Sequence, residues 1–121
     1  MIGYVTVGTN DLEKAGKFYD ELLGVLGAKR VMEMERFIGW GTGPGAPMLL
    51  VMKPYDGKPA TVGNGVMVAL HAGTQANVDA LFNKARALGG PDEGAPGIRM
   101  GTFYGAYSRD ADGNKLCFFI M

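Results

Sequence analysis

This chain of 121 residues contains an internal repeat, and the repeat limits the possible folds more than any other feature. When the sequence is shifted by 63 residues, the apolar segment 4–7 falls on the apolar segment 67–70. The same shift superimposes two apolar stripes with helical spacing and places Gly27 on Gly90. Because each repeat has an apolar face that it cannot bury alone, the two repeats must complete a fold together.

The first repeat is predicted to form a strand, a helix and three further strands. Thr9, Asn10 and Asp11 are candidate helix caps, and Glu13, three residues after Asn10, is typical of a capping box. Apolar side chains then recur with the period of a helix as far as Leu26. The expected elements are a strand at 2–7, a helix at 12–26, and strands at 29–34, 36–41 and 47–53.

The second repeat follows the same order. Thr74 is expected to cap its helix, the segment 91–97 is typical of a loop, and Asp112-Gly113 is typical of a tight hairpin turn. The expected strands of this repeat are 66–72, 100–109 and 116–121.

Together the repeats predict an α+β fold made of paired βαβββ modules. The modules span about residues 1–55 and 64–121 of a single domain, 1–121. Their curved mixed sheets are expected to form a cup with the helices outside.

Composition and charge argue against several classes of partner. The 12 basic and 12 acidic side chains give a net charge of zero, so no charge excess attracts nucleic acid or an acidic membrane. No apolar stretch reaches the length of a membrane span, and the first residues do not resemble a signal peptide. The only cysteine, Cys117, excludes an internal disulfide. We therefore expect a cytoplasmic protein with neither nucleic-acid nor membrane partners.

The order and spacing of these segments resemble the vicinal oxygen chelate superfamily of glyoxalases, bleomycin resistance proteins and extradiol dioxygenases. Similar segments are 2–7, 11–19 and 63–65, and the most specific is 103–115, which resembles the closing hairpin of small bacterial glyoxalase-like proteins. The resemblance covers essentially the whole chain. It implies the paired-module fold and, because many relatives bind their ligand at a subunit interface, a homodimer.

In metal-using members of this superfamily, each half supplies one ligand from its first strand and a carboxylate from its last. The resemblance places the two first-strand ligands at Tyr4 and Met67, one carboxylate at Cys117 and the other near 50–52. Hard divalent metals prefer carboxylate and imidazole ligands, so we expect no such cofactor. A soft Cu(I) site at Met67 and Cys117 lacks a second thiolate, and a repacked apolar pocket explains these residues better.

Three polar side chains are further candidates for contact with a ligand. His71, the only histidine, is expected on the same strand face as Met67 and is either an acid–base group, a polar anchor or an ordinary strand-end histidine. Arg99 and Arg109 flank an aromatic strand. Either arginine could pair with a carboxylate or phosphate, although a solvated loop arginine is the simpler interpretation.

The predicted function is metal-independent binding of an apolar or aromatic small molecule in the cup. One alternative is a lyase- or dioxygenase-like enzyme that uses His71 or Tyr4 as acid–base group, or that holds a metal through non-standard residues. Another is a structural or regulatory module whose cup is filled by its own side chains. The residues expected to contact the ligand are Tyr4, Trp40, Met67, His71, Tyr107 and Cys117.

Overall fold

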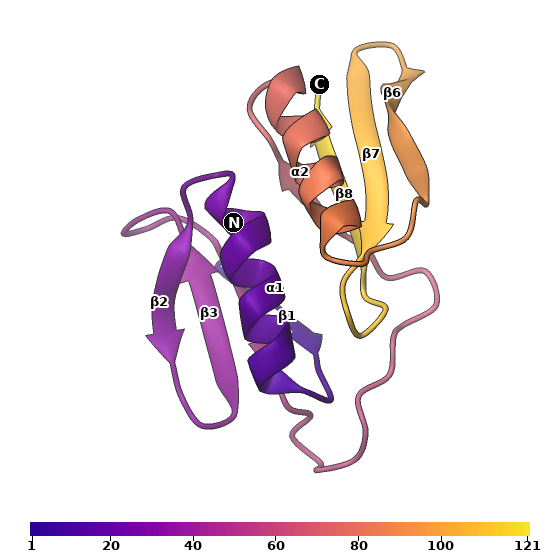
Figure 1. Cartoon of the computed structure of the whole chain (residues 1–121). Coiled ribbons are helices and arrows are strands. Elements are labelled where there is room, and N and C mark those ends of the chain that lie inside the picture. Colours follow the sequence, from indigo (N-terminus) through magenta and orange to yellow (C-terminus); the bar gives the residue numbers. More distant parts are fainter. The chain divides into compact units, whose positions relative to one another are not determined.

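The computed structural model describes all 121 residues and divides into two compact units, Met1–Val62 and Gly63–Met121. Each unit contains one of the predicted repeats and has the order strand, helix and three strands (Figure 1). The α+β class and the paired βαβββ modules are therefore confirmed. Neither helix combines the length and the apolar character that a membrane crossing requires.

In unit 1, the helix packs on one face of a four-stranded sheet. The elements are β1 (Tyr4–Gly8), α1 (Leu12–Gly24), β2 (Lys29–Glu33), β3 (Phe37–Gly41) and β4 (Met48–Met52). The strand order is β1-β4-β3-β2, in which β1 and β4 are parallel and the other pairs are antiparallel. Helix α1 contacts β2, β3 and β4. We call the opposite side of the sheet the helix-free face of unit 1.

Unit 2 repeats this topology. The elements are β5 (Val68–His71), α2 (Gln75–Ala87), β6 (Gly94–Met100), β7 (Phe103–Arg109) and β8 (Lys115–Ile120). The strand order β5-β8-β7-β6 is equivalent to that of unit 1, and the one parallel pair is again the first strand with the last. Helix α2 contacts β6, β7 and β8, which leaves a helix-free face of unit 2 on the other side.

Each unit has its own hydrophobic core between its helix and its sheet. The side chains buried between helix and sheet include Val7, Phe18, Tyr19, Leu22, Ile38, Trp40, Leu49 and Val51 in unit 1, and Val78, Leu81, Phe82, Ala85, Ala106, Leu116 and Phe118 in unit 2. Successive strand residues point to opposite faces, so this core identifies which positions remain on each helix-free face.

The two helices preserve the repeat closely. Both have 13 residues, and their N-caps, Asp11 and Thr74, are 63 residues apart. The Asp11 carboxylate accepts a hydrogen bond from the backbone N–H of Lys14 at 3.0 Å, and the Thr74 hydroxyl accepts one from Asn77 at 3.1 Å. Thr74 is thus confirmed as a cap.

The predicted capping box of Asn10 and Glu13 is wrong. Of the three candidate caps, Asp11 directly precedes the first helical residue and is confirmed as the cap. The Asn10 side chain instead exchanges two hydrogen bonds with the backbone of Ala60, at 3.2 and 2.6 Å, and Glu13 pairs with Lys17 at 3.5 Å.

Two predictions about the second repeat have different outcomes. The loop expected at 91–97 is largely strand β6, which lies at the edge of its sheet and pairs with β7 through two register shifts. Pro96 cannot donate a hydrogen bond to a neighbouring strand, and an edge strand with irregular register tolerates it. The proline therefore makes this segment look like a loop in the sequence. A hairpin turn is present near Asp112-Gly113, but it is not the predicted tight turn: the connection spans residues 110–114, and the backbone N–H of Gly113 donates to the Asp110 carbonyl at 3.0 Å. The Asp110 carboxylate accepts hydrogen bonds from the backbone of Asp112 and Asn114 at 3.0 and 2.9 Å.

Candidate functional site

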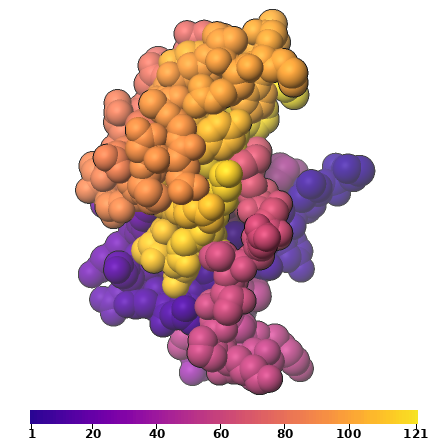
Figure 2. Space-filling model, turned by 90° about the vertical axis from the view of Figure 1, so that its right-hand side faces the viewer, coloured from indigo at the N-terminus to yellow at the C-terminus, as the bar shows by residue number.

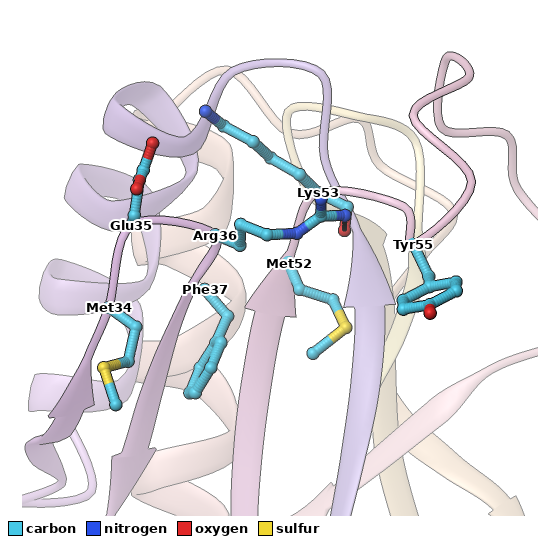
Figure 3. Close-up of a pocket in the computed structure, with 7 residues that line it drawn as sticks. All are labelled: Met34, Glu35, Arg36, Phe37, Met52, Lys53 and Tyr55. Atoms are coloured by element: carbon cyan, nitrogen blue, oxygen red, sulfur yellow. Dashed lines mark hydrogen bonds between the residues drawn. The ribbon is translucent and has the colours of Figure 1, made fainter.

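A pocket of about 510 Å³ lies in unit 1, where the β2–β3 connection approaches the end of β4 (Figure 3). Its lining residues are Met34, Glu35, Arg36, Phe37, Met52, Lys53 and Tyr55. Figure 3 shows Met34 and Phe37 on one side, Tyr55 on the other and Met52 between them. The segment that follows β4, coloured pink in Figure 2, lies at the surface.

The apolar part of this pocket belongs to the helix-free face of unit 1. Phe37 pairs with Met52 across β3 and β4, and directly paired residues share a face. Their chain neighbours Ile38 and Val51 are buried in the core on the other face. Thioether and aromatic side chains form an adaptable apolar surface that suits ligands of varied shape.

Arg36 fixes the polar wall of the pocket. Its guanidinium donates hydrogen bonds to the backbone carbonyls of Lys53 at 3.3 Å and Pro54 at 2.6 Å. These bonds hold the segment after β4 against the start of β3, so Tyr55 emerges beside the pocket. The sequence does not predict this site, because several of its residues lie in connections, which carry no strand or helix period.

The two predicted ligand residues of unit 1 lie on different faces of its sheet. Tyr4 is 59% exposed at the start of β1, on the same face as its pairing partner Met48. Trp40 is only 1% exposed, and its ring centroid is 5.5 Å from that of Tyr19 on α1. The structure thus places Trp40 in the core and not among the surface residues that a ligand could contact.

Four predicted ligand residues lie in unit 2. Tyr107 on β7 pairs directly with Cys117 on β8, so both belong to one face. Tyr104 lies three residues before Tyr107 on β7, so its side chain points to the opposite face, where it donates a hydrogen bond to Asp79 on α2 at 2.6 Å. Tyr107 and Cys117 therefore lie on the helix-free face. Met67 precedes β5 and is partly exposed.

His71 lies beside an aromatic pair on this face. Its ring centroid is 5.3 Å from that of Phe119, which stacks at 5.3 Å on Phe103. The His71 Nδ1 atom accepts a hydrogen bond from the backbone N–H of Gly73 at 3.2 Å. Phe103 and Phe119 were not predicted as site residues, although both lie an even number of positions from Tyr107 or Cys117 on their strands.

Cys117 is fully buried beneath its neighbours. Burial is the main cause that raises the pKa of its thiol, and it outweighs the lowering by Tyr107 and by the positive charges of Arg99 and Lys115. Burial is also the main cause that raises the pKa of Tyr107. Cys117 is therefore a protonated packing residue at neutral pH and not a reactive thiolate.

The register of the sheets identifies the fourth position of the implied metal site. Cys117 pairs with Ala69, and the repeat-equivalent residue Thr6 pairs with Leu50. Leu50 is therefore the counterpart of Cys117, and the remaining two positions hold Tyr4 and Met67. A phenol, an alkyl chain, a thioether and a buried thiol do not fit a hard divalent metal. Within each unit, no three His, Cys, Asp or Glu side chains form a cluster that could hold a metal ion.

The topology of both units, with the first strand parallel to the last and a helix on one face, defines a protein of paired βαβββ modules. The sequence model of the Glyoxalase/Bleomycin resistance protein/Dioxygenase superfamily matches residues 1–118. The chain therefore belongs to this superfamily. No curated protein matches it significantly.

Solved structures agree with this assignment. A glyoxalase/bleomycin resistance protein from Albidiferax ferrireducens T118 is 40% identical, with a TM-score of 0.88 over 98% of this chain and 97% of that one. A hypothetical protein from S. aureus is 27% identical, with a TM-score of 0.72 over 100% and 96%. Lactoylglutathione lyase from Agrobacterium tumefaciens, 23% identical with a TM-score of 0.72 over 98% and 92%, shares the fold.

Proposed function

We propose that this protein binds an apolar or aromatic small molecule without the help of a metal ion. The observation that supports this most strongly is the pocket of unit 1. Its volume of about 510 Å³ is within the range of small-molecule sites, which is about 300–1,000 Å³. Its walls of Met34, Phe37, Met52 and Tyr55 offer apolar and aromatic contact, and Arg36 and Lys53 supply polar groups at the edge.

The residues at the implied metal positions support the metal-independent part of the proposal. Leu50 and Met67 have no oxygen or nitrogen donor in their side chains, and the thiol of Cys117 is buried with a raised pKa. Burial of apolar ligand surface can supply the affinity in place of a metal–ligand bond.

One observation favours the alternative of an enzyme that uses His71. Because Nδ1 of His71 accepts a hydrogen bond from Gly73, the neutral ring carries its proton on Nε2. The Nε2–H group beside the Phe103–Phe119 pair could donate a hydrogen bond to an oxygen of a bound aromatic molecule and stabilise negative charge that develops there during a reaction. A His71→Ala variant that keeps binding but loses turnover of a substrate would establish this function.

Binding is tested with 1-naphthol, a neutral aromatic probe, and protein labelled with ¹³C at the methionine methyl groups. We expect saturable shifts of the Met34 and Met52 methyl signals, unchanged by a metal chelator. Met34→Gln should weaken the affinity about fivefold, because a polar amide replaces a thioether in the apolar wall.

The matched control is Met100→Gln, which changes another exposed methionine in unit 2. This variant should bind 1-naphthol as the wild-type chain does. The proposal fails if the shifts of Met34 and Met52 do not saturate, if the chelator abolishes them, or if both variants lose affinity equally.

We also propose that the chain forms a homodimer. Exposed apolar side chains such as Val31 and Met32 on β2 and Ile98 on β6 support this, because such surfaces often mark interaction sites. Light scattering on the eluting protein should give twice the mass of the 12.8 kDa chain. The mass of a single chain at micromolar concentration would contradict this assembly.

A further inference from the structure

The helix-free face of unit 2 has an excess of positive charge around Tyr107. The Arg99 guanidinium carbon is 5.5 Å from the Tyr107 ring centroid, and the Lys115 Nζ atom is 5.6 Å from it. Arg99 approaches from β6 and Lys115 from β8, the two strands that flank β7. A third cation, Arg109, pairs across the strands with Lys115.

Only one of these three cations is neutralised by a carboxylate. Arg109 Nε donates to Glu93 Oε1 at 3.0 Å. Arg99 and Lys115 form no ion pair, in contrast to Arg30 of unit 1, which contacts two carboxylates. Cation–π contact stabilises a positive charge but does not neutralise it, so the surface beside Tyr107 attracts anions.

The backbone of β6 holds Arg99 in a defined position. A Cβ atom at Gly94 would lie 3.1 Å from Arg99 Nη2, and one at Gly97 would lie 3.1 Å from Nη1. The two glycines therefore give the guanidinium room to lie along the strand. Nη2 also donates a hydrogen bond to the Ala95 carbonyl at 2.5 Å. The guanidinium is thus oriented before any ligand binds, which lowers the entropic cost of binding.

We propose that Arg99 and Lys115 form a binding site for an oxyanion, the carboxylate or phosphate group of a small molecule that lies against Tyr107. The remaining guanidinium N–H groups of Arg99 suit such a group, and the Lys115 ammonium adds a second positive charge. The Tyr107 ring offers an aromatic surface to the rest of the molecule. This site belongs to unit 2 and does not depend on the unit 1 pocket.

The site is tested by titrating the whole protein with sodium phosphate and, separately, with sodium benzoate at constant ionic strength. The signals to follow by NMR are the Tyr107 ring and the amides of Gly94 and Gly97, with sodium chloride as the baseline. We expect saturable shifts with at least one of the two anions. Saturation by phosphate alone or by benzoate alone identifies which oxyanion the site takes.

The double variant Arg99→Gln, Lys115→Gln should lower the affinity at least tenfold, whereas Lys84→Gln should not change it. Lys84 lies on α2, on the other side of the sheet, and gives the same loss of charge per substitution. If the double variant does not fold by circular dichroism, the two single variants replace it. Shifts that match those with chloride, or equal affinity in the wild-type and variant proteins, would overturn the proposal.

Discussion

Asp20 links a helix to two strands in unit 1. Its carboxylate accepts hydrogen bonds from Arg30 Nε at 2.8 Å and from the indole Nε1 of Trp40 at 2.9 Å. These contacts lower the pKa of Asp20, and the hydrogen bond from Arg30 is the largest cause. The same residue thus satisfies the only polar group of a buried tryptophan and orients an arginine.

Replacement of Asp20 by asparagine should destabilise the protein by about 1 kcal/mol at neutral pH, because the hydrogen bond from Arg30 loses its charged acceptor. The loss is no larger because the side chain is partly exposed and solvent screens the ion pair. The pKa of Asp20 is lower in the folded chain than in the unfolded one. The wild-type chain therefore has this stabilisation in full at pH values above about 3.8, the ordinary pKa of aspartate. It loses the stabilisation as pH falls through the lower folded pKa. Urea unfolding followed by circular dichroism should therefore show the two proteins converging in acid.

Glu21→Gln is the matched control for this experiment, since Glu21 is an exposed neighbour on the same helix. It should leave the pH profile of stability unchanged. A constant difference between the wild-type protein and Asp20→Asn down to the acid limit would contradict the role given to the Asp20 charge.

Cys117 should be inert to thiol reagents in the native protein. Burial raises the pKa of its thiol, so little thiolate exists at neutral pH, and the side chain has no exposed surface. Reaction with Ellman's reagent should follow unfolding in urea and not precede it. Rapid labelling of the folded chain would show that the cover over Cys117 opens readily.

At the scale of residues, Tyr107 and Cys117 are each predicted to contact a ligand, but their pairing cannot be read from the sequence. A two-residue turn at Asp112-Gly113 would pair Tyr107 with Phe118, whereas the five-residue connection 110–114 pairs it with Cys117. The sequence also does not predict the position of Trp40. The segment 37–41, Phe-Ile-Gly-Trp-Gly, has apolar or small residues on both faces, so its alternation does not reveal which side faces the helix.

Among the elements, the two helix ends show how one position of the repeat can need glycine for different reasons. Gly27, after α1, has a positive φ of 75°, and a Cβ there would meet nothing within 4 Å. At the equivalent Gly90, a Cβ would lie 2.6 Å from Ser108 Oγ and 2.9 Å from the carbonyls of Ala85 and Arg109.

Alanine substitutions should separate these two causes. Gly27→Ala should cost about 1 kcal/mol, because only the backbone conformation is disfavoured. Gly90→Ala should cost about 2–3 kcal/mol, because strand and helix backbones must move apart. Urea midpoints measure both effects.

Gly24→Ala provides the control within α1. Gly24 is helical, and a Cβ there meets nothing within 4 Å, so alanine should be neutral or stabilising by up to about 1 kcal/mol. Equal losses for Gly27→Ala and Gly90→Ala would contradict the distinction between backbone conformation and space.

At this scale, the sequence predicts both helices well, since the apolar period and the terminal glycines agree and the caps Asp11 and Thr74 are among the candidates. The capping box is absent, and α1 ends at Gly24, two residues before the predicted end. It predicts β6 poorly, because Gly94, Pro96 and Gly97 remove the pattern of a strand while the neighbouring β7 still supplies hydrogen bonds. The pocket of unit 1 is also missed, since its shape comes from the contact of Arg36 with the segment after β4.

For the molecule as a whole, the connection between the two units should be its first site of proteolysis. Tyr55 is 96% exposed, whereas both nearby lysines, Lys53 and Lys58, precede proline and resist trypsin. Chymotrypsin should therefore cleave first after Tyr55 and give fragments 1–55 and 56–121 by mass spectrometry. Bound 1-naphthol should slow this cleavage, since Tyr55 lines the unit 1 pocket.

The control is Tyr55→Ala, which removes the cleavage site and should lengthen the lifetime of the intact chain in chymotrypsin. A first cut elsewhere, for example after the exposed Tyr4, would contradict the assignment. In that case the hydrogen bonds of strand β1 would be weaker than the structure indicates.

Trp40 is the single tryptophan of the chain, and it lies in the core of unit 1. Tryptophan fluorescence therefore follows the unfolding of unit 1 alone, because unit 2 contains tyrosines but no tryptophan. An emission transition that coincides with the loss of circular dichroism would mean that the two cores melt cooperatively. Two separate midpoints would show that the two units of the duplicated chain unfold independently, each with its own free energy of unfolding.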